Sequence, residues 1–232
     1  MLHGFSSTPK EFEELSAYLS EKKFNVLVPL LVGHGTSPED FAKTSPEDWV
    51  KSAMAAYLKL KKISEKIFII GNSFGSNVGL CLVKDLKNEP SGIIVLGTPV
   101  FLRFHNFLKF RLFTYGRFKK YYKKPAWLYR TEYTGIENGA SYPLVSIKNL
   151  NEGIKFLEQE TMPNLSKIKV PILIASARVD PIVDRKSVDY IFDNIGSTKK
   201  EVFWFDGIKH DLVSGGSKGL FYRIYEFITG TK

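Results

Sequence analysis

The sequence predicts an α/β fold, in which a mostly parallel sheet has helices on both faces. Short apolar runs rich in β-branched residues alternate along the chain with segments of helical periodicity. These runs are apolar almost throughout, as expected for strands that are buried on both faces of a parallel sheet. One junction between such a run and a helix reads Gly71-Asn72-Ser73-Phe74-Gly75. With 232 residues, of which 44% are hydrophobic, the chain can form one large domain of this class.

The apolar runs and helical patterns predict the following elements in chain order. Thr8 and Glu11 have the spacing of a capping box with Pro9 at the first helical position, so a helix is expected to begin there. Further helices are expected from Ser45, from Ser73 to about Lys87, from about Arg185, and over 220–228. The predicted strands are 24–29, 66–70, 93–96, 170–175 and 201–205.

The composition favours a protein of a reducing compartment. The sequence contains no run of about 18 apolar residues and no signal-peptide pattern at its N-terminus, so we expect a cytoplasmic protein without a transmembrane helix. Cys81, the only cysteine, lies in the predicted helix after Ser73, and we expect a buried structural thiol. Zinc-binding and P-loop motifs are absent from the sequence, which argues against zinc and P-loop chemistry.

The Gly-x-Ser-x-Gly pattern predicts that Ser73 is a nucleophile. In a strained turn between a strand and a helix, the serine hydroxyl is held above the sheet. Gly71 and Gly75 must then be small, because the strand and the helix pass close beside them. The alternative is a glycine-rich turn in which the serine has no chemical role.

A serine nucleophile needs an imidazole as its base and a carboxylate that orients the imidazole. In a parallel sheet, these groups come from loops at the carboxyl ends of the strands. Asp180 follows the predicted strand 170–175, and His210 follows 201–205. We therefore predict that Asp180 and His210 are the partners of Ser73.

Other residues fit these two roles less well. His105 follows no predicted strand, His34 lies between two glycines in a loop, and His3 belongs to a different motif. Asp184 and Asp206 remain alternatives for the acid, although Asp184 also fits the start of the next helix.

Acyl transfer also requires two N–H donors that bind the developing oxyanion. One donor is the residue after the nucleophile, which is Phe74 here. The second commonly lies in the loop after an early strand, where the sequence reads His3-Gly4-Phe5, and the N–H group of Phe5 is our candidate.

On six motifs the chain resembles the α/β-hydrolases, and within them the carboxylesterase and monoacylglycerol-lipase group. The resemblance covers residue 1 to the C-terminus except about 101–160. It implies Ser73 as nucleophile, Asp180 and His210 as its partners, Phe5 and Phe74 as oxyanion donors, and no metal or organic cofactor. The motifs are His3-Gly4-Phe5, Gly33-His34-Gly35, Asp48-Trp49, 71–75, 176–183 and Lys209-His210-Asp211.

Members of that group have two or more strands before the His-Gly motif, whereas only Met1 and Leu2 precede it here. Either the start of the chain has been placed too late, or the protein is a shortened variant whose sheet lacks these strands and has an exposed edge. Such an open sheet edge favours association into a homodimer, and it would leave the oxyanion loop less well supported.

The net charge of +9 is concentrated in residues 101–130, which hold nine Lys or Arg, eleven aromatic residues and no Asp or Glu. Phenylalanines recur at every third position from Phe101 to Phe113, a spacing that turns around a helix and leaves no single apolar face. The family commonly inserts a cap here, so we predict a core of 1–100 and 161–232 and a cap of 101–160.

Three interpretations of this basic aromatic segment remain open. It could contact an anionic membrane surface through aromatic insertion and charge attraction. It could be an ordinary cap with a solvated basic face. It could bind nucleic acid, although no recognised module accompanies it.

The sequence as a whole predicts a serine hydrolase that cleaves carboxylic esters through an acyl-enzyme. The expected substrates are a monoacylglycerol, a lysophospholipid or a medium-chain ester. The alternatives are a thioesterase or acyltransferase with the same three residues, and a lipid-binding relative without activity.

Overall fold

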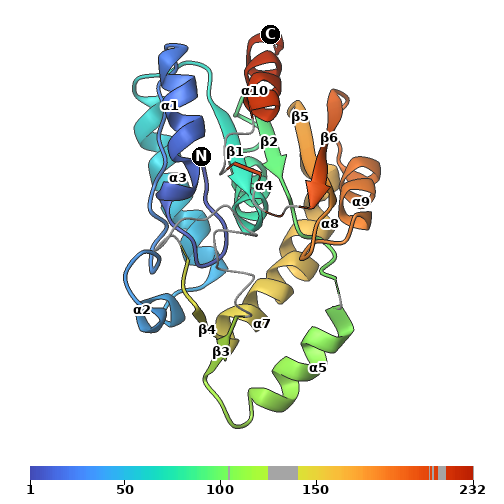
Figure 1. Ribbon diagram of the computed structural model, residues 1–232. Helices are drawn as coiled ribbons and strands as arrows, with labels where there is room; N and C mark the ends of the chain where they lie inside the picture. Colours follow the sequence, from blue (N-terminus) through green and yellow to red (C-terminus); the bar gives the residue numbers. More distant parts are fainter. Residues whose placement is uncertain (104, 125–140, 209, 211, 214–217, 232) are drawn as a thin grey trace.

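The computed structural model describes residues 1–103, 105–124, 141–208, 210, 212–213 and 218–231 (Figure 1). Within these residues the main sheet has four parallel strands, in the spatial order β1-β2-β5-β6. Four of the five predicted strands are confirmed. The strands are β1 (Phe68–Asn72), β2 (Gly92–Leu96), β5 (Ile172–Val179) and β6 (Lys200–Ile208).

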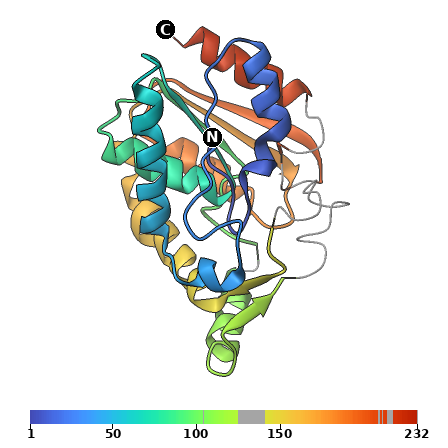
Figure 2. The same cartoon turned by 90° about the vertical axis from the view of Figure 1, so that its left-hand side faces the viewer.

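Helices cover both faces of the sheet, as the sequence predicted (Figures 1 and 2). In β2, Ile93 and Val95 point into the core under α3, α4 and α9, whereas Ile94 and Leu96 point into the core under α1 and α10. Because both faces are buried, the strands read as continuous apolar runs. The helices are α1 (Glu13–Glu21), α3 (Pro46–Lys61), α4 (Phe74–Asp85), α9 (Lys186–Asn194) and α10 (Lys218–Gly230).

The predicted strand at 24–29 was wrong. Phe24, Val26 and Val28 do pack against the α1–α10 core, which accounts for their strand-like alternation. The backbone of the segment, however, meets the N-terminus at one point, where the Met1 ammonium donates to the Leu27 carbonyl at 2.7 Å. A single contact of this kind does not form a ladder of strand pairing.

The homodimer expected from an open sheet edge stays a prediction.

Beside β1, the chain forms one parallel bridge between Leu2 and Gly71. Leu2 N–H donates to the Ile70 carbonyl at 2.8 Å, and Asn72 N–H donates to the Leu2 carbonyl at 3.0 Å. The first residues of the chain are thereby fixed against the strand that leads to Ser73.

The described residues of the segment 101–160 lie toward the end of the molecule to which the main strands point (Figure 1). The helices α5 and α7 pack against each other through Leu112, Ile147 and Ile154, a small cluster separate from the two main cores. The division of the chain into core and cap stays a prediction. The elements in and around this segment are α2 (Pro38–Ala42), α5 (His105–Tyr115), β3 (Tyr121–Lys123), β4 (Leu144–Ser146), α7 (Ile147–Phe156) and α8 (Met162–Asn164).

Part of the predicted basic aromatic segment lies outside the described residues, namely residues 104 and 125–130 and the side chains of His105, Phe107, Leu108 and Tyr115. In the part of the chain that is described, no helix has the length and apolar character needed to cross a bilayer.

Candidate active site

Ser73 occupies a strained turn between β1 and α4. Its backbone has φ 51° and ψ −125°, a region that residues other than glycine rarely adopt. The turn is held by Ser73 N–H, which donates to the Leu96 carbonyl at 2.7 Å, and by Ser76 N–H, which donates to the Ser73 carbonyl at 3.0 Å. This is the geometry that the Gly-x-Ser-x-Gly pattern predicted.

The two flanking glycines are required by close packing. A Cβ atom added at Gly71 would lie 2.4 Å from the Cα of Ser76, and one added at Gly75 would lie 2.1 Å from the Leu2 carbonyl oxygen. Both distances are far shorter than any van der Waals contact. No side chain fits at either position without moving the backbone of α4 or of Leu2.

The structure brings together the three residues predicted for catalysis. Ser73 Oγ lies 2.9 Å from His210 Nε2, and His210 Nδ1 lies 2.8 Å from Asp180 Oδ2. The other carboxylate oxygen, Oδ1, accepts hydrogen bonds from Ile182 N–H at 2.7 Å and from Val183 N–H at 2.9 Å. An ionised carboxylate only accepts, so the proton of the neutral imidazole lies on Nδ1, and Nε2 can accept the serine proton.

The alternative acids have other partners. Asp206 pairs with Arg178 at 2.8 Å and its side chain is 88% exposed. Asp184 accepts the N–H group of Lys186 at 3.0 Å, at the start of α9. The geometry therefore favours Asp180. Nowhere in the described part of the chain do three His, Cys, Asp or Glu side chains gather as ligands of a metal ion.

Two basic residues of the segment 101–130 donate hydrogen bonds to loops of the site, which the sequence did not indicate. Arg103 Nη1 donates to the Asp180 carbonyl at 3.0 Å and so supports the loop that carries the acid. Lys124 Nζ donates to Ser6 Oγ at 3.0 Å, directly after the His3-Gly4-Phe5 motif. Burial lowers the pKa of Lys124 to about 8.

Both candidate oxyanion donors lie beside Ser73. Phe74 is the first residue of α4, so its N–H group has no acceptor within the helix. On the other side, a Cβ atom added at Gly4 would lie 3.4 Å from Ser73 Cβ, which places the Gly4–Phe5 backbone against the nucleophile. The Phe5 and Phe74 rings are in contact, with their centroids 5.7 Å apart. The oxyanion role of the two N–H groups stays a prediction.

Glu11 supports this arrangement, and the sequence analysis missed it. The predicted capping box was wrong, because the Thr8 side chain makes no capping hydrogen bond. Glu11 turns inward instead and is only 4% exposed. Its Oε2 accepts Gly4 N–H at 3.1 Å, and its Oε1 accepts the Asn72 side-chain amide. The carboxylate thereby joins the residue before Phe5 to the residue before Ser73.

The sequence does contain a signal for this role. Glu11 lies four positions before Leu15 and eight before Leu19, so in a helix it shares their apolar face. A carboxylate on a face that packs into the core needs polar partners there, since an unpaired buried charge is strongly unfavourable.

His3 and His34 form a buried pair of neutral imidazoles beside the Gly4–Phe5 backbone, with ring centroids 4.8 Å apart. His3 Nδ1–H donates to the Gly4 carbonyl at 3.2 Å, and its Nε2 accepts Leu31 N–H at 3.1 Å. His34 Nδ1–H donates to the Val32 carbonyl at 3.2 Å. Burial lowers the pKa of His3 to about 3 and that of His34 to about 4.

We therefore expect the free energy of unfolding to fall as the pH is lowered below about 6.5. In that range the unfolded chain binds protons at His3 and His34, whereas the folded protein keeps both neutral until the pH reaches about 4. Each histidine then lowers the free energy of unfolding by about 1.4 kcal/mol per pH unit. For the pair, the loss amounts to about 4 kcal/mol at pH 5. Urea unfolding at pH 7 and pH 5 measures this, and equal stabilities would contradict it.

A family model described as "Serine aminopeptidase, S33" matches residues 1–215. A carboxylesterase of Bacillus subtilis is 26% identical over 231 residues, which cover 98% of this chain and 90% of the relative. A thermostable monoacylglycerol lipase of Bacillus sp. strain H-257 is 27% identical over 205 residues, or 87% of this chain and 78% of the relative.

Solved structures show the same fold. The monoacylglycerol lipase of Paleococcus ferrophilus superposes with a TM-score of 0.82 at 20% identity, over 100% of this chain and 93% of the other. A structure from the metagenome-derived lipolytic enzymes LipS and LipT superposes with a TM-score of 0.86 at 22% identity, over 98% and 91%. The chain has the α/β-hydrolase fold and belongs to this serine aminopeptidase family of hydrolases.

Proposed function

We propose that the protein is a serine hydrolase that cleaves carboxylic esters through an acyl-enzyme. The observation that carries the proposal is the hydrogen-bonded chain from Ser73 Oγ through His210 to Asp180, at a strained turn. Two of the hydrolases similar to this chain are a carboxylesterase and a monoacylglycerol lipase, which favours an ester over a peptide as substrate.

In the proposed reaction, Ser73 Oγ attacks the ester carbonyl carbon while His210 Nε2 takes the hydroxyl proton. The N–H groups of Phe5 and Phe74 bind the resulting oxyanion, and Asp180 stabilises the imidazolium. The imidazolium then protonates the leaving alcohol, so the ester bond breaks and the acyl group remains on Ser73. Water repeats both steps, which releases the carboxylic acid and restores the serine.

The proposed substrates are monoacylglycerols, lysophospholipids or simple medium-chain esters. The test is hydrolysis of p-nitrophenyl esters of short, medium and long acyl chains, with Ser73→Ala as the background. Intact mass after treatment with a fluorophosphonate should show one adduct per chain, and none in that variant. A folded wild-type protein that neither turns over an ester nor forms the adduct would contradict the proposal.

Three further substrates separate the related activities. Faster turnover of the matching thioester would indicate a thioesterase, and transfer of the acyl group to an added alcohol would indicate an acyltransferase. Hydrolysis of an aminoacyl p-nitroanilide in preference to the esters would indicate a peptidase. Saturable binding of a monoacylglycerol without turnover would indicate a lipid-binding relative.

A further inference from the structure

We propose that the outer surface of α5 and of the turn between α5 and β3 docks onto a bilayer that contains anionic lipid. The docking face, as we define it, comprises three phenylalanines and three cations that lie within ten positions of one another. The inference concerns binding and does not depend on the proposed reaction. These residues are Phe110, Phe113, Arg117, Phe118, Lys119 and Lys120.

The phenylalanines of the docking face are not used by the fold. Phe110 and Phe113 are each 64% exposed and Phe118 is 88% exposed. The packing of α5 against α7 is provided instead by Leu112, which is 1% exposed. Three large aromatic side chains held in water on adjacent turns gain apolar contact when they enter the boundary between headgroups and acyl chains.

The charges of this face suit an anionic surface. Arg117, Lys119 and Lys120 are exposed, and residues 101–124 contain no Asp or Glu. Nearby carboxylates belong to α7 and the turn after it, where Glu152 pairs with Lys148 and Glu158 pairs with Lys109. The Arg117 guanidinium lies 4.9 Å from the centre of the Phe113 ring, so cation and aromatic ring approach the same surface together.

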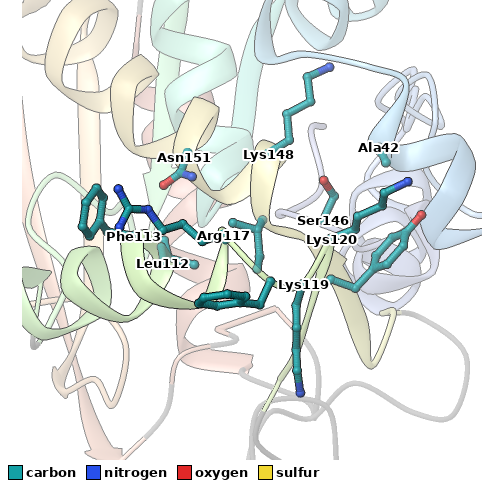
Figure 3. Close-up of a pocket in the computed structure, with 13 residues that line it drawn as sticks. Ala42, Leu112, Phe113, Arg117, Lys119, Lys120, Ser146, Lys148 and Asn151 are labelled. Carbon is teal, nitrogen blue, oxygen red and sulfur yellow. The ribbon is translucent and has the colours of Figure 1, made fainter.

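The arrangement of the cations favours many anionic groups over one bound anion. A hollow of about 790 Å³ lies between the docking face and the start of α7. Figure 3 shows that the side chains around it diverge, since Lys148 and Lys119 point in opposite directions and the Arg117 guanidinium extends toward Phe113. A site for a single phosphate would require these groups to converge. Divergent cations instead match headgroups spread over a surface.

The docking face lies one helix away from the candidate active site. On the opposite side of α7, a Cβ atom added at Gly153 would lie 3.4 Å from the Phe74 ring and 3.5 Å from the Phe5 ring. The Phe156 ring contacts that of Phe74, with centroids 5.7 Å apart. A bilayer on the outer side of α5 would therefore lie at the same end of the molecule as Ser73. An apolar acyl substrate would be concentrated in that bilayer.

The test is sedimentation of the full chain with vesicles, at low and high salt. Vesicles of phosphatidylglycerol and phosphatidylcholine should bind the protein at 0.01 M salt. Binding should weaken in 0.5 M salt, because the Debye length falls from about 30 Å to less than about 8 Å. Replacing Arg117, Lys119 and Lys120 by Gln should lower the partition coefficient by about 100-fold, at about fivefold per cation. Replacing Phe110, Phe113 and Phe118 by Ser should abolish the salt-resistant part of the binding.

The matched control lies at the opposite end of the sheet, where α3 ends and the chain turns toward the start of β1. One control variant replaces Lys59, Lys61 and Lys62 by Gln, which removes the same charge. A second replaces Leu58 and Ile63 by Ser, which removes exposed apolar side chains. These variants should bind vesicles like the wild type. Thermal melting confirms that every variant is folded.

Several results would overturn the proposal. They are equal binding to pure phosphatidylcholine vesicles, equal losses in the docking-face and control variants, and no binding of the wild type to any vesicle. Binding of a DNA duplex in place of vesicles would assign the docking face to nucleic acid and would also reject the membrane proposal.

Discussion

Asp180→Asn is expected to lower kcat by about 10⁴-fold while the protein remains folded. The reason lies in the two backbone donors at Oδ1, Ile182 N–H and Val183 N–H. They fix the remaining oxygen of the asparagine amide in the place of Oδ1, so the NH₂ group must face His210 Nδ1. Nδ1 then accepts, the imidazole proton moves to Nε2, and the ring can no longer take the proton of Ser73.

The measurement is kcat and KM on the best p-nitrophenyl ester, with the urea midpoint as the test of folding. Asp206→Asn is the matched control, because this exposed carboxylate lies on the neighbouring strand β6 and its loss should change kcat by less than about twofold. A loss of similar size in both variants would remove Asp180 from the proposed role. A wild-type kcat in Asp180→Asn would also remove Asp180 from the proposed role.

Glu11→Ala is expected to lower kcat by about 10-fold to 100-fold and to leave KM nearly unchanged. The carboxylate accepts Gly4 N–H and the Asn72 amide, and so fixes the positions of the two loops that present Phe5 and Ser73. Complete loss of one oxyanion donor typically costs about 10²–10³ in kcat, and a displaced donor loses part of that. Two buried donors left without an acceptor should also lower the free energy of unfolding by about 2–4 kcal/mol.

Glu11→Gln separates positioning from mere loss of stability. The glutamine oxygen can still accept Gly4 N–H, and its NH₂ group can donate to Asn72 once that amide turns. The Oδ1 atom of Asn72 is buried and has no hydrogen-bond partner among the described residues, so it is available as the acceptor. We expect Glu11→Gln to recover most of kcat. Glu13→Ala, at an exposed site on α1, should behave like the wild type.

The role of Glu11 is decided by kcat and KM of Glu11→Ala, Glu11→Gln and Glu13→Ala. They are measured under conditions in which urea unfolding shows each variant to be fully folded. If KM rises and kcat stays constant in Glu11→Ala, then Glu11 acts on substrate binding and the positioning role is rejected. If Glu11→Gln is as impaired as Glu11→Ala, then the hydrogen bonds described are not the relevant ones.

The strands and the constellation around Ser73 could be predicted because their signals are local. A buried parallel strand is apolar at every position, so β2 and β5 could be recognised from a few residues. The loop after each strand necessarily lies at the same sheet edge, which brought Asp180 and His210 to Ser73 without further information.

What the sequence did not reveal depends on the direction of a side chain or on a distant partner. Thr8 and Glu11 fit a capping box by spacing, yet Glu11 turns to Gly4 and Asn72, and Asn72 is 61 positions away. In the same way, the alternating Phe24, Val26 and Val28 pack into the core, but none of the described strands pairs with them. Spacing identifies a face, whereas hydrogen-bond partners are set by tertiary contacts.

The central pairing of the sheet, between β2 and β5, has a consequence for how the protein folds. The segment 97–171 separates these two strands, so their pairing closes a long loop before its contacts can stabilise it. Ser73 belongs to the half of the sheet before this loop, and Asp180 and His210 belong to the half after it. Neither half alone holds all three residues, so a folding intermediate that contains only one half is inactive. Recovery of activity during refolding therefore reports the closure of the whole sheet.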